Sequence, residues 1–270
     1  MRAQAGLDLR EYKTKNYTIH SDCDPAVVEQ AARHMEGVNA EYSRRMRSFP
    51  VKNRNPVNVY LLNGRQRYLE LLASKGINGA GSGGMFFISG SEQALVVYFS
   101  EQEGYQRLWD VMEHEGFHQF ARQRLGFNLP TWLNEGIAEY FERGDVHQGE
   151  FRTGYADPDE VEYLRRQVRE DRMIPLETLL TLDGRVWNAA VAAGGAFDNY
   201  LQSWATVQFF VHAEDGRYQP YFLEFIRQIA RGVDTQDAFR QAFKTDNLGL
   251  VESRIHKYLE RDLRQGWPSR

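Results

Sequence analysis

The first hundred residues alternate between strand-like and helix-like hydrophobic patterns. The pattern of residues 12–22, which ends in turn-forming residues, predicts an early strand. From Asp24 and Pro25 to about Arg47, apolar residues recur at helical spacing, and this pattern predicts a long helix. Strands are also predicted over 56–63, 85–90 and 94–100, with a helix over 64–76 and a glycine-rich loop over 77–84.

After residue 104 the hydrophobic pattern becomes almost entirely helical. Residues 105–125 form one helical segment, and residues 131–144 form another, which we expect to be capped by Thr131 and to stop at Gly144. The predicted fold is therefore α+β: a small mixed N-terminal lobe (1–104) and a mostly helical C-terminal lobe (105–270). Further helices are predicted over 159–170, 176–182, 197–214, 220–232, 234–243 and from Leu248 onward.

Composition narrows the class of protein. Of the 270 residues, 42% are hydrophobic and 13% aromatic, which is enough for a substantial core. The formal net charge is −4, so neither sign dominates, and this argues against a dedicated nucleic-acid binder. Cys23 is the only cysteine, so neither an intrachain disulfide nor a cysteine-based zinc cluster can form. It sits beside two aspartates, without a base partner that would make it a nucleophile.

Segments that target proteins to membranes are not evident. The first residues contain no apolar core of signal-peptide length, and no window approaches 18 consecutive apolar residues. We therefore expect no membrane span. These patterns leave both the compartment and the oligomeric state open.

The segment HEGFH, residues 114–118, is the strongest chemical signal. Four residues advance an α-helix by about 400°, so His114 and His118 lie one turn apart on one face and their imidazoles can converge on one ion. Zinc accepts neutral imidazole nitrogen in near-tetrahedral geometry. Glu115 lies about 100° around the helix from His114, where it can take a proton from the attacking water without binding the ion. We therefore predict a zinc site with Glu115 as the general base.

A third ligand is expected on the following helix. Glu135 lies 17 residues after His118, beyond a turn at 126–130, and an antiparallel return would bring its carboxylate toward the histidines. Glu139 follows one helical turn later on the same face, where it could hydrogen-bond the outer nitrogen of a ligand histidine. The reverse assignment, with Glu139 as ligand and Glu135 in support, stays open. Glu142 is expected to be solvated.

HEGFH and WLNEGIAEYF together resemble the gluzincin metallopeptidases, the clan of the thermolysin-like enzymes and the zinc aminopeptidases. The nearest likeness is to poorly characterised peptidase-like domains of exported bacterial proteins. The resemblance implies His114, His118 and Glu135 as zinc ligands and Glu115 as the base. It also implies a thermolysin-like catalytic fold, with a zinc cleft between the lobes and an edge strand that pairs with extended substrate. The spacing from the second histidine to the glutamate is slightly shorter than in the two well-known groups, which implies a tighter turn.

The resemblance also nominates a donor for the oxyanion that forms when a peptide carbonyl is attacked. In the aminopeptidase branch a tyrosine at the start of a later helix has this role, and NYLQSWATVQFFVH resembles that segment. Tyr200 is thereby the candidate, with Tyr155, Tyr221 and His212 as alternates.

GSGGMFF, residues 81–87, sits where the zinc aminopeptidases capture the substrate amino terminus. The acidic and asparagine residues of their motif are missing here, which favours an endopeptidase over an aminopeptidase. An equally good interpretation is that Gly81, Gly83 and Gly84 only form a turn.

The sequence thus predicts a zinc metallopeptidase that hydrolyses peptide or protein substrates. The main alternative is a non-catalytic, zinc-containing, peptidase-like module that binds a protein partner. A non-peptide hydrolase with the same zinc and base is a weaker third hypothesis. Export to the periplasm or outside the cell is expected only from the resemblance.

Overall fold

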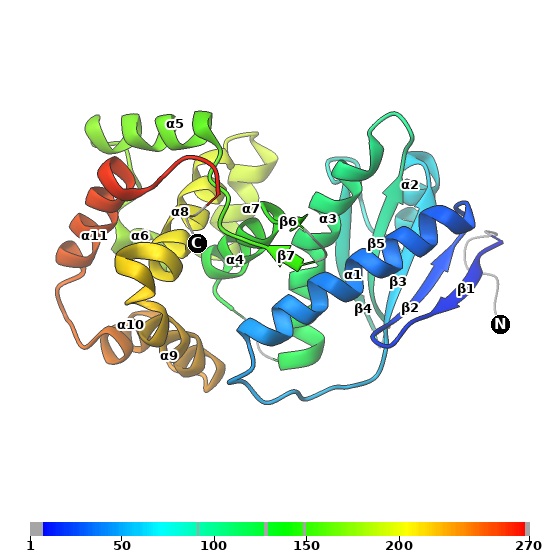
Figure 1. Cartoon of the computed structure of the whole chain (residues 1–270), viewed down its shortest axis with the longest axis horizontal. Coiled ribbons are helices and arrows are strands. Elements are labelled where there is room, and N and C mark those ends of the chain that lie inside the picture. The colour runs from blue at the N-terminus through cyan, green and yellow to red at the C-terminus, as the bar shows by residue number, and fades with distance from the viewer. Residues whose placement is uncertain (1–7, 91, 127–128, 148–149, 268–270) are drawn as a thin grey trace. The chain divides into compact units, whose positions relative to one another are not determined.

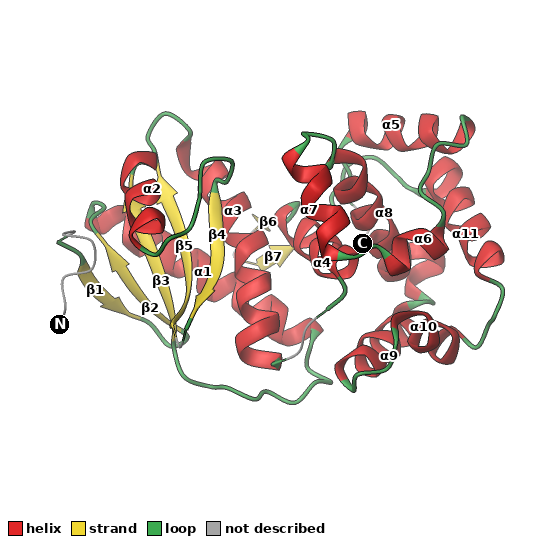
Figure 2. Ribbon diagram, turned by 180° about the vertical axis from the view of Figure 1, so that it is seen from behind, coloured by secondary structure: helices red, strands yellow, loops and turns green. Residues whose placement is uncertain are grey.

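A five-stranded mixed sheet forms the centre of the N-terminal unit in the computed structural model, which describes residues 8–90, 92–126, 129–147 and 150–267. The strand order is β1-β2-β3-β5-β4 (Figure 2). The three inner strands run parallel, and β1 and β4 pair antiparallel at the two ends. The strands are β1 (Arg10–Lys13), β2 (Tyr17–Ser21), β3 (Val57–Asn63), β4 (Gly84–Ser89) and β5 (Glu92–Phe99).

Helices cover both faces of this sheet (Figure 1). Successive strand side chains point to opposite faces, so Val59 and Leu61 pack under helices α1 (Pro25–Arg45) and α3 (Gly104–Gln119). Tyr60 and Leu62 point the other way, toward α2 (Arg65–Ser74). A strand buried on both faces forms a continuous apolar run in the sequence, and residues 59–62 have this pattern.

The helix ends follow the expected capping chemistry. Asp24 accepts a hydrogen bond from the Ala26 amide at 2.8 Å and caps α1, and Pro25 occupies its first position. Gly76 follows α2 with a φ of +74°, a conformation that glycine adopts without strain. The α3 helix continues into a π-helical turn, Phe120–Leu125, and ends at Gly126 with a φ of +70°.

The second unit is helical. Helices α4 (Thr131–Glu142) and α8 (Phe197–Gly216) pack along one another, and Gly136 allows the close approach. A cluster of aromatic rings in contact fills the core where α8, α9 and α10 meet. The other helices of this unit are α5 (Pro158–Arg169), α6 (Leu176–Thr181), α7 (Gly184–Ala192), α9 (Gln219–Ala230), α10 (Thr235–Phe243), α11 (Leu248–Lys257) and the π-helical turn Tyr258–Asp262. Separately from these helices, β6 (Asp145–His147) and β7 (Glu150–Arg152) pair as a two-stranded sheet.

The predicted α+β class, with a small mixed sheet followed by a mostly helical region, is confirmed. Four local differences appear. The early strand is two strands, β1 and β2; helix α7 and the β6–β7 pair were not expected. Thr131 is the first residue of α4 and not its cap, because Pro130 holds the cap position and offers no side-chain acceptor.

The chain divides into two compact units, 1–126 with 146–151, and 127–145 with 152–270. The predicted boundary after residue 104 falls at the start of α3, whereas the structure groups α3 with the sheet. The physical reason is that Leu108, Val111 and Met112 belong to the core under α1. Among the described residues, no helix has both the length and the apolar character needed to cross a membrane.

Candidate metal centre

The two histidines of HEGFH lie on the last turns of α3. Their ring centroids are 4.9 Å apart, with the ring planes at 84°. Both side chains are half-buried. Because α3 is anchored to the sheet through Leu108, Val111 and Met112, the imidazoles project from a fixed helix and not from a loop.

A buried polar pair lies beside this site. Glu113 is 1% exposed, and its Oε1 is 2.8 Å from Nε2 of His34 on α1. Burial lowers the pKa of His34 to about 4. The hydroxyl of Tyr42 donates to the Glu113 carbonyl oxygen at 2.5 Å, so α1 holds the α3 backbone one residue before His114. This arrangement fixes where the histidine turn begins.

Glu115 is held by the sheet. The backbone amide of Phe86 on β4 donates to its Oε2 at 2.8 Å. β4 is the last strand in the sheet order, so this N–H belongs to a sheet edge and points away from β5. The carboxylate that we predict as general base is therefore oriented by a main-chain donor.

Glycine allows β4 to approach α3 this closely. A Cβ added to Gly84 would lie 2.2 Å from Cγ1 of Val111. Gly84 is the first residue of β4, so its role is to let the strand pack against the helix. The sequence left open a substrate-binding segment or a simple turn, and the packing of Gly84 against α3 is a third role that neither interpretation included.

Glu135 belongs to the other unit and is placed by α4. Its neighbours Trp132, Leu133 and Ile137 are buried, and Glu135 itself is half-buried. The prediction that this helix is not a solvated acidic surface agrees with that burial. Residues 127 and 128 of the expected turn between the helices lie outside the described residues.

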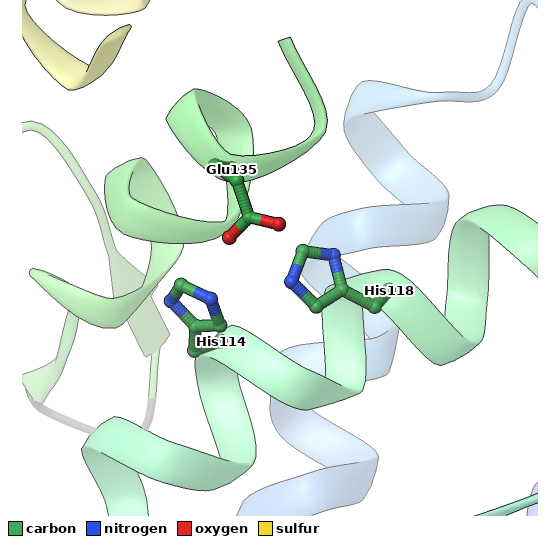
Figure 3. Close-up of side chains that lie close together, drawn as sticks. All are labelled: His114, His118 and Glu135. Atoms are coloured by element: carbon green, nitrogen blue, oxygen red, sulfur yellow. The ribbon is translucent and has the colours of Figure 1, made fainter. Parts of the chain in front are cut away.

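Two groups of potential ligands occur among the described residues. His114, His118 and Glu135 each offer one ligand atom, and these atoms lie within 4.8 Å of one another (Figure 3). The potential ligand atoms of His114, Glu139 and Glu142 also lie within 4.8 Å of one another. The first group is the predicted ligand set, and the second contains the alternative ligand Glu139 together with Glu142, which we expected to be solvated.

Glu139 is already engaged by a cation. Its carboxylate pairs with Arg143, one turn later on α4, and Arg143 also contacts Glu160 at 2.9 Å. Burial alone lowers the pKa of Arg143, but the charges of Glu139 and Glu160 outweigh it and hold that pKa above its usual value. A carboxylate with a bound guanidinium is a poorer metal ligand, which counts against Glu139 as the third ligand. The supporting role of Glu139 stays a prediction.

The predicted oxyanion donors lie in the helical unit. Tyr200 is half-buried on the first turn of α8, where its ring meets Trp187 edge-on at 4.9 Å. Tyr155 packs on Trp267, and Tyr221 is 40% exposed on α9. The catalytic role of Tyr200 stays a prediction.

His212 takes part in a local network. The hydroxyl of Tyr140 lies 2.9 Å from Nε2 of His212 and 2.8 Å from Oγ1 of Thr153. These contacts join α8 to α4 and to the segment after β7. They give His212 a structural role in the helical unit.

Sequence patterns did not find Phe86, His34 or Glu113 as neighbours of the site. The Phe86 contact uses a main-chain group, which carries no side-chain signal. His34 and Glu113 are separated by 79 residues, so only the tertiary fold brings them together. The only sequence feature that linked this pair to the site is that Glu113 directly precedes His114.

Comparison with known protein families finds a match over part of the chain. A family described as "Protein of unknown function (DUF1570)" matches residues 110–232. The matched segment includes HEGFH, Glu135 and Tyr200, but its description names no activity. A search of curated proteins finds no match.

Proposed function

We propose that the chain is a zinc-dependent peptidase, with His114, His118 and Glu135 as metal ligands and Glu115 as general base. The observation that supports this most is the approach of two imidazole nitrogens and one carboxylate oxygen to within 4.8 Å of one another. Glu115, the residue after the first histidine, adds an oriented carboxylate.

The donor set suits zinc. Tetrahedral ligands with bonds of about 2.0–2.1 Å are separated by roughly 3.3 Å, so donor atoms within 4.8 Å need only small side-chain adjustments to share one ion. Imidazole and carboxylate are common zinc ligands, and three protein ligands leave a position for water or substrate. When bound, zinc would supply an acidified water and polarise the substrate carbonyl.

The protein's own residues would provide the remaining chemistry. Glu115 accepts the proton of the attacking water and passes it to the leaving amine. The Phe86 amide holds one oxygen of that carboxylate, which leaves the other oxygen for the water. Tyr200 is proposed as a further donor to the oxyanion.

β4 supports peptides as the substrate class. The sheet order places β4 at an end, so one side of this strand lacks a neighbouring strand among the described residues. An extended peptide can add to such an edge through main-chain hydrogen bonds. Pairing of this kind accepts the interior of a chain, which favours an endopeptidase.

The test combines metal analysis with proteolysis. Purified protein should carry about one zinc per chain and should cleave an unstructured protein substrate, and a chelator should remove both properties. Glu115→Gln should retain zinc and lose cleavage, whereas His118→Ala should lose the zinc itself.

Two other outcomes would count against the proposal. A protein without zinc affinity would refute the metal site. A zinc-loaded protein that cleaves neither peptides nor small esters would refute the peptidase and support the non-catalytic binding module.

A further inference from the structure

A hollow of about 560 Å³ lies beside the glycine-rich loop that precedes β4. It belongs wholly to the sheet-containing unit. Arg65 enters it from the first position of α2, and Arg107 from the first turn of α3. The other lining residues are Ala80, Gly81, Ser82, Gly83, Tyr98 and Glu103.

Both guanidinium groups lie against the loop backbone. Nη2 of Arg65 donates to the carbonyl oxygen of Ala80 at 2.5 Å. A Cβ on Gly83 would lie 2.4 Å from Nη2 of Arg107, so the absent side chain lets that guanidinium lie against the loop. The two cations therefore lie beside the same short segment.

The charge in the hollow is positive. Two guanidiniums face a single carboxylate, that of Glu103, which accepts from the Tyr98 hydroxyl at 3.2 Å to each oxygen. Among the described residues, neither Arg65 nor Arg107 forms an ion pair. Guanidinium donors match the geometry of a carboxylate and can bind it with two parallel hydrogen bonds.

The hollow is close along the chain to the proposed base. The loop runs directly into β4, and Gly83 precedes Phe86 by three residues. At about 3.3 Å per residue, the hollow lies roughly 10 Å along the strand from the amide that holds Glu115. A peptide paired with β4 could thus place a group in the hollow about three residues from the bond being cut.

We infer that this hollow is a subsite for a carboxylate of the peptide substrate, bound by Arg65 and Arg107. The inference rests on the proposed peptidase function for the identity of the ligand. The carboxylate is either an acidic side chain or a free carboxyl terminus.

The test measures binding without cleavage. In the Glu115→Gln background, with zinc bound, capped fluorescent peptides that carry Asp or Asn at successive positions are titrated and followed by anisotropy. A second pair differs only in a free or an amidated carboxyl terminus. We expect one position, or the free terminus, to favour the carboxylate about tenfold, and Arg107→Gln and Arg65→Gln to reduce this preference to about twofold or less.

Arg54→Gln is the matched control, because it removes the same charge from an exposed loop residue of the same unit. It should keep the tenfold preference, and melting curves should show all three variants folded. The subsite is refuted if no peptide shows a carboxylate preference, or if Arg107→Gln and Arg54→Gln keep the same preference. Zinc content and cleavage by the parent protein are measured separately, so failure of the peptidase proposal is recognised independently of failure of the subsite.

Discussion

The amide of Phe86 donates to Oε2 of Glu115 at 2.8 Å, so a sheet edge orients the candidate general base. Proline at position 86 removes that donor, while the ladder to β5 uses the other side of the strand. Loss of one hydrogen bond to a charged group costs about 1.5–3 kcal/mol. We expect Phe86→Pro to lower kcat/KM for peptide cleavage at least about tenfold, with zinc content unchanged.

Ile88→Pro is the control for proline on this strand. Ile88 lies two residues further along β4, so its amide points to the same edge, and its side chain is 48% exposed. It should retain most of the activity. Equal losses in the two variants would show that disturbance of β4, and not the bond to Glu115, explains the effect.

Gly136 should be intolerant of any side chain. A Cβ at this position would lie 2.7 Å from the carbonyl oxygen of Ser203, and backbone atoms cannot move aside cheaply. We expect Gly136→Ala to cost about 1–3 kcal/mol of unfolding free energy, measured by urea denaturation. A methyl group at Gly37 on α1 would have no neighbouring atom within 4 Å, so Gly37→Ala should instead stabilise the protein by about 0.5–1 kcal/mol. Destabilisation of similar size at both glycines would contradict the argument from close packing.

Hydrophobic periodicity and capping residues predicted much of this fold, because these patterns are strong within individual helices and strands. The helical period and Asp24 marked α1, and the buried runs marked β3 and β5. Patterns were weaker where residues are small, as in α7 with its alanines, and where strands are three residues long, as in β6 and β7.

In the candidate site, too, some features follow from local sequence and others depend on the tertiary fold. Two histidines four residues apart share a helix face by geometry alone, so their proximity followed from sequence. The position of Glu135 depends on how the chain returns, and the contact of Phe86 depends on a strand that is 29 residues away. The pairing of Glu139 with Arg143 is local to α4, but the participation of Glu160 is set by the packing of α5.

Cys23 should be unreactive in the folded protein. Its side chain is 1% exposed, and burial raises the pKa of the thiol from 9.0 to about 11. At pH 8 only about 0.1% of such a thiol is ionised, and the thiolate is the reactive form. An aromatic disulfide reagent should label Cys23 slowly until denaturant unfolds the chain, and fast labelling of the native protein would contradict the burial.

The raised pKa of the Cys23 thiol also predicts that stability depends on pH. The folded pKa lies above the unfolded value, so the unfolded chain releases its thiol proton first, and stability present below pH 9 is lost as the pH rises toward 11. Urea unfolding of the parent and of Cys23→Ala at pH 8 to 10.5 isolates this contribution, because other groups titrate equally in both proteins. The parent should lose stability more steeply than the variant above pH 9.

Arg143 should be essential for the packing of α4. It pairs with Glu139 and Glu160, lies 4.9 Å from the ring centroid of Trp204, and its side chain is only 16% exposed. Arg143→Met would leave two half-buried carboxylates close together without a cation, and removal of one partner from a buried ion pair costs about 3–5 kcal/mol. Because these side chains keep some solvent contact, we expect about 3 kcal/mol at pH 7. Glu160→Gln keeps the Glu139–Arg143 pair and should cost about 1 kcal/mol. Urea unfolding at pH 7 measures both differences, and Arg143→Met as stable as Glu160→Gln would show that the guanidinium is not needed to hold Glu139.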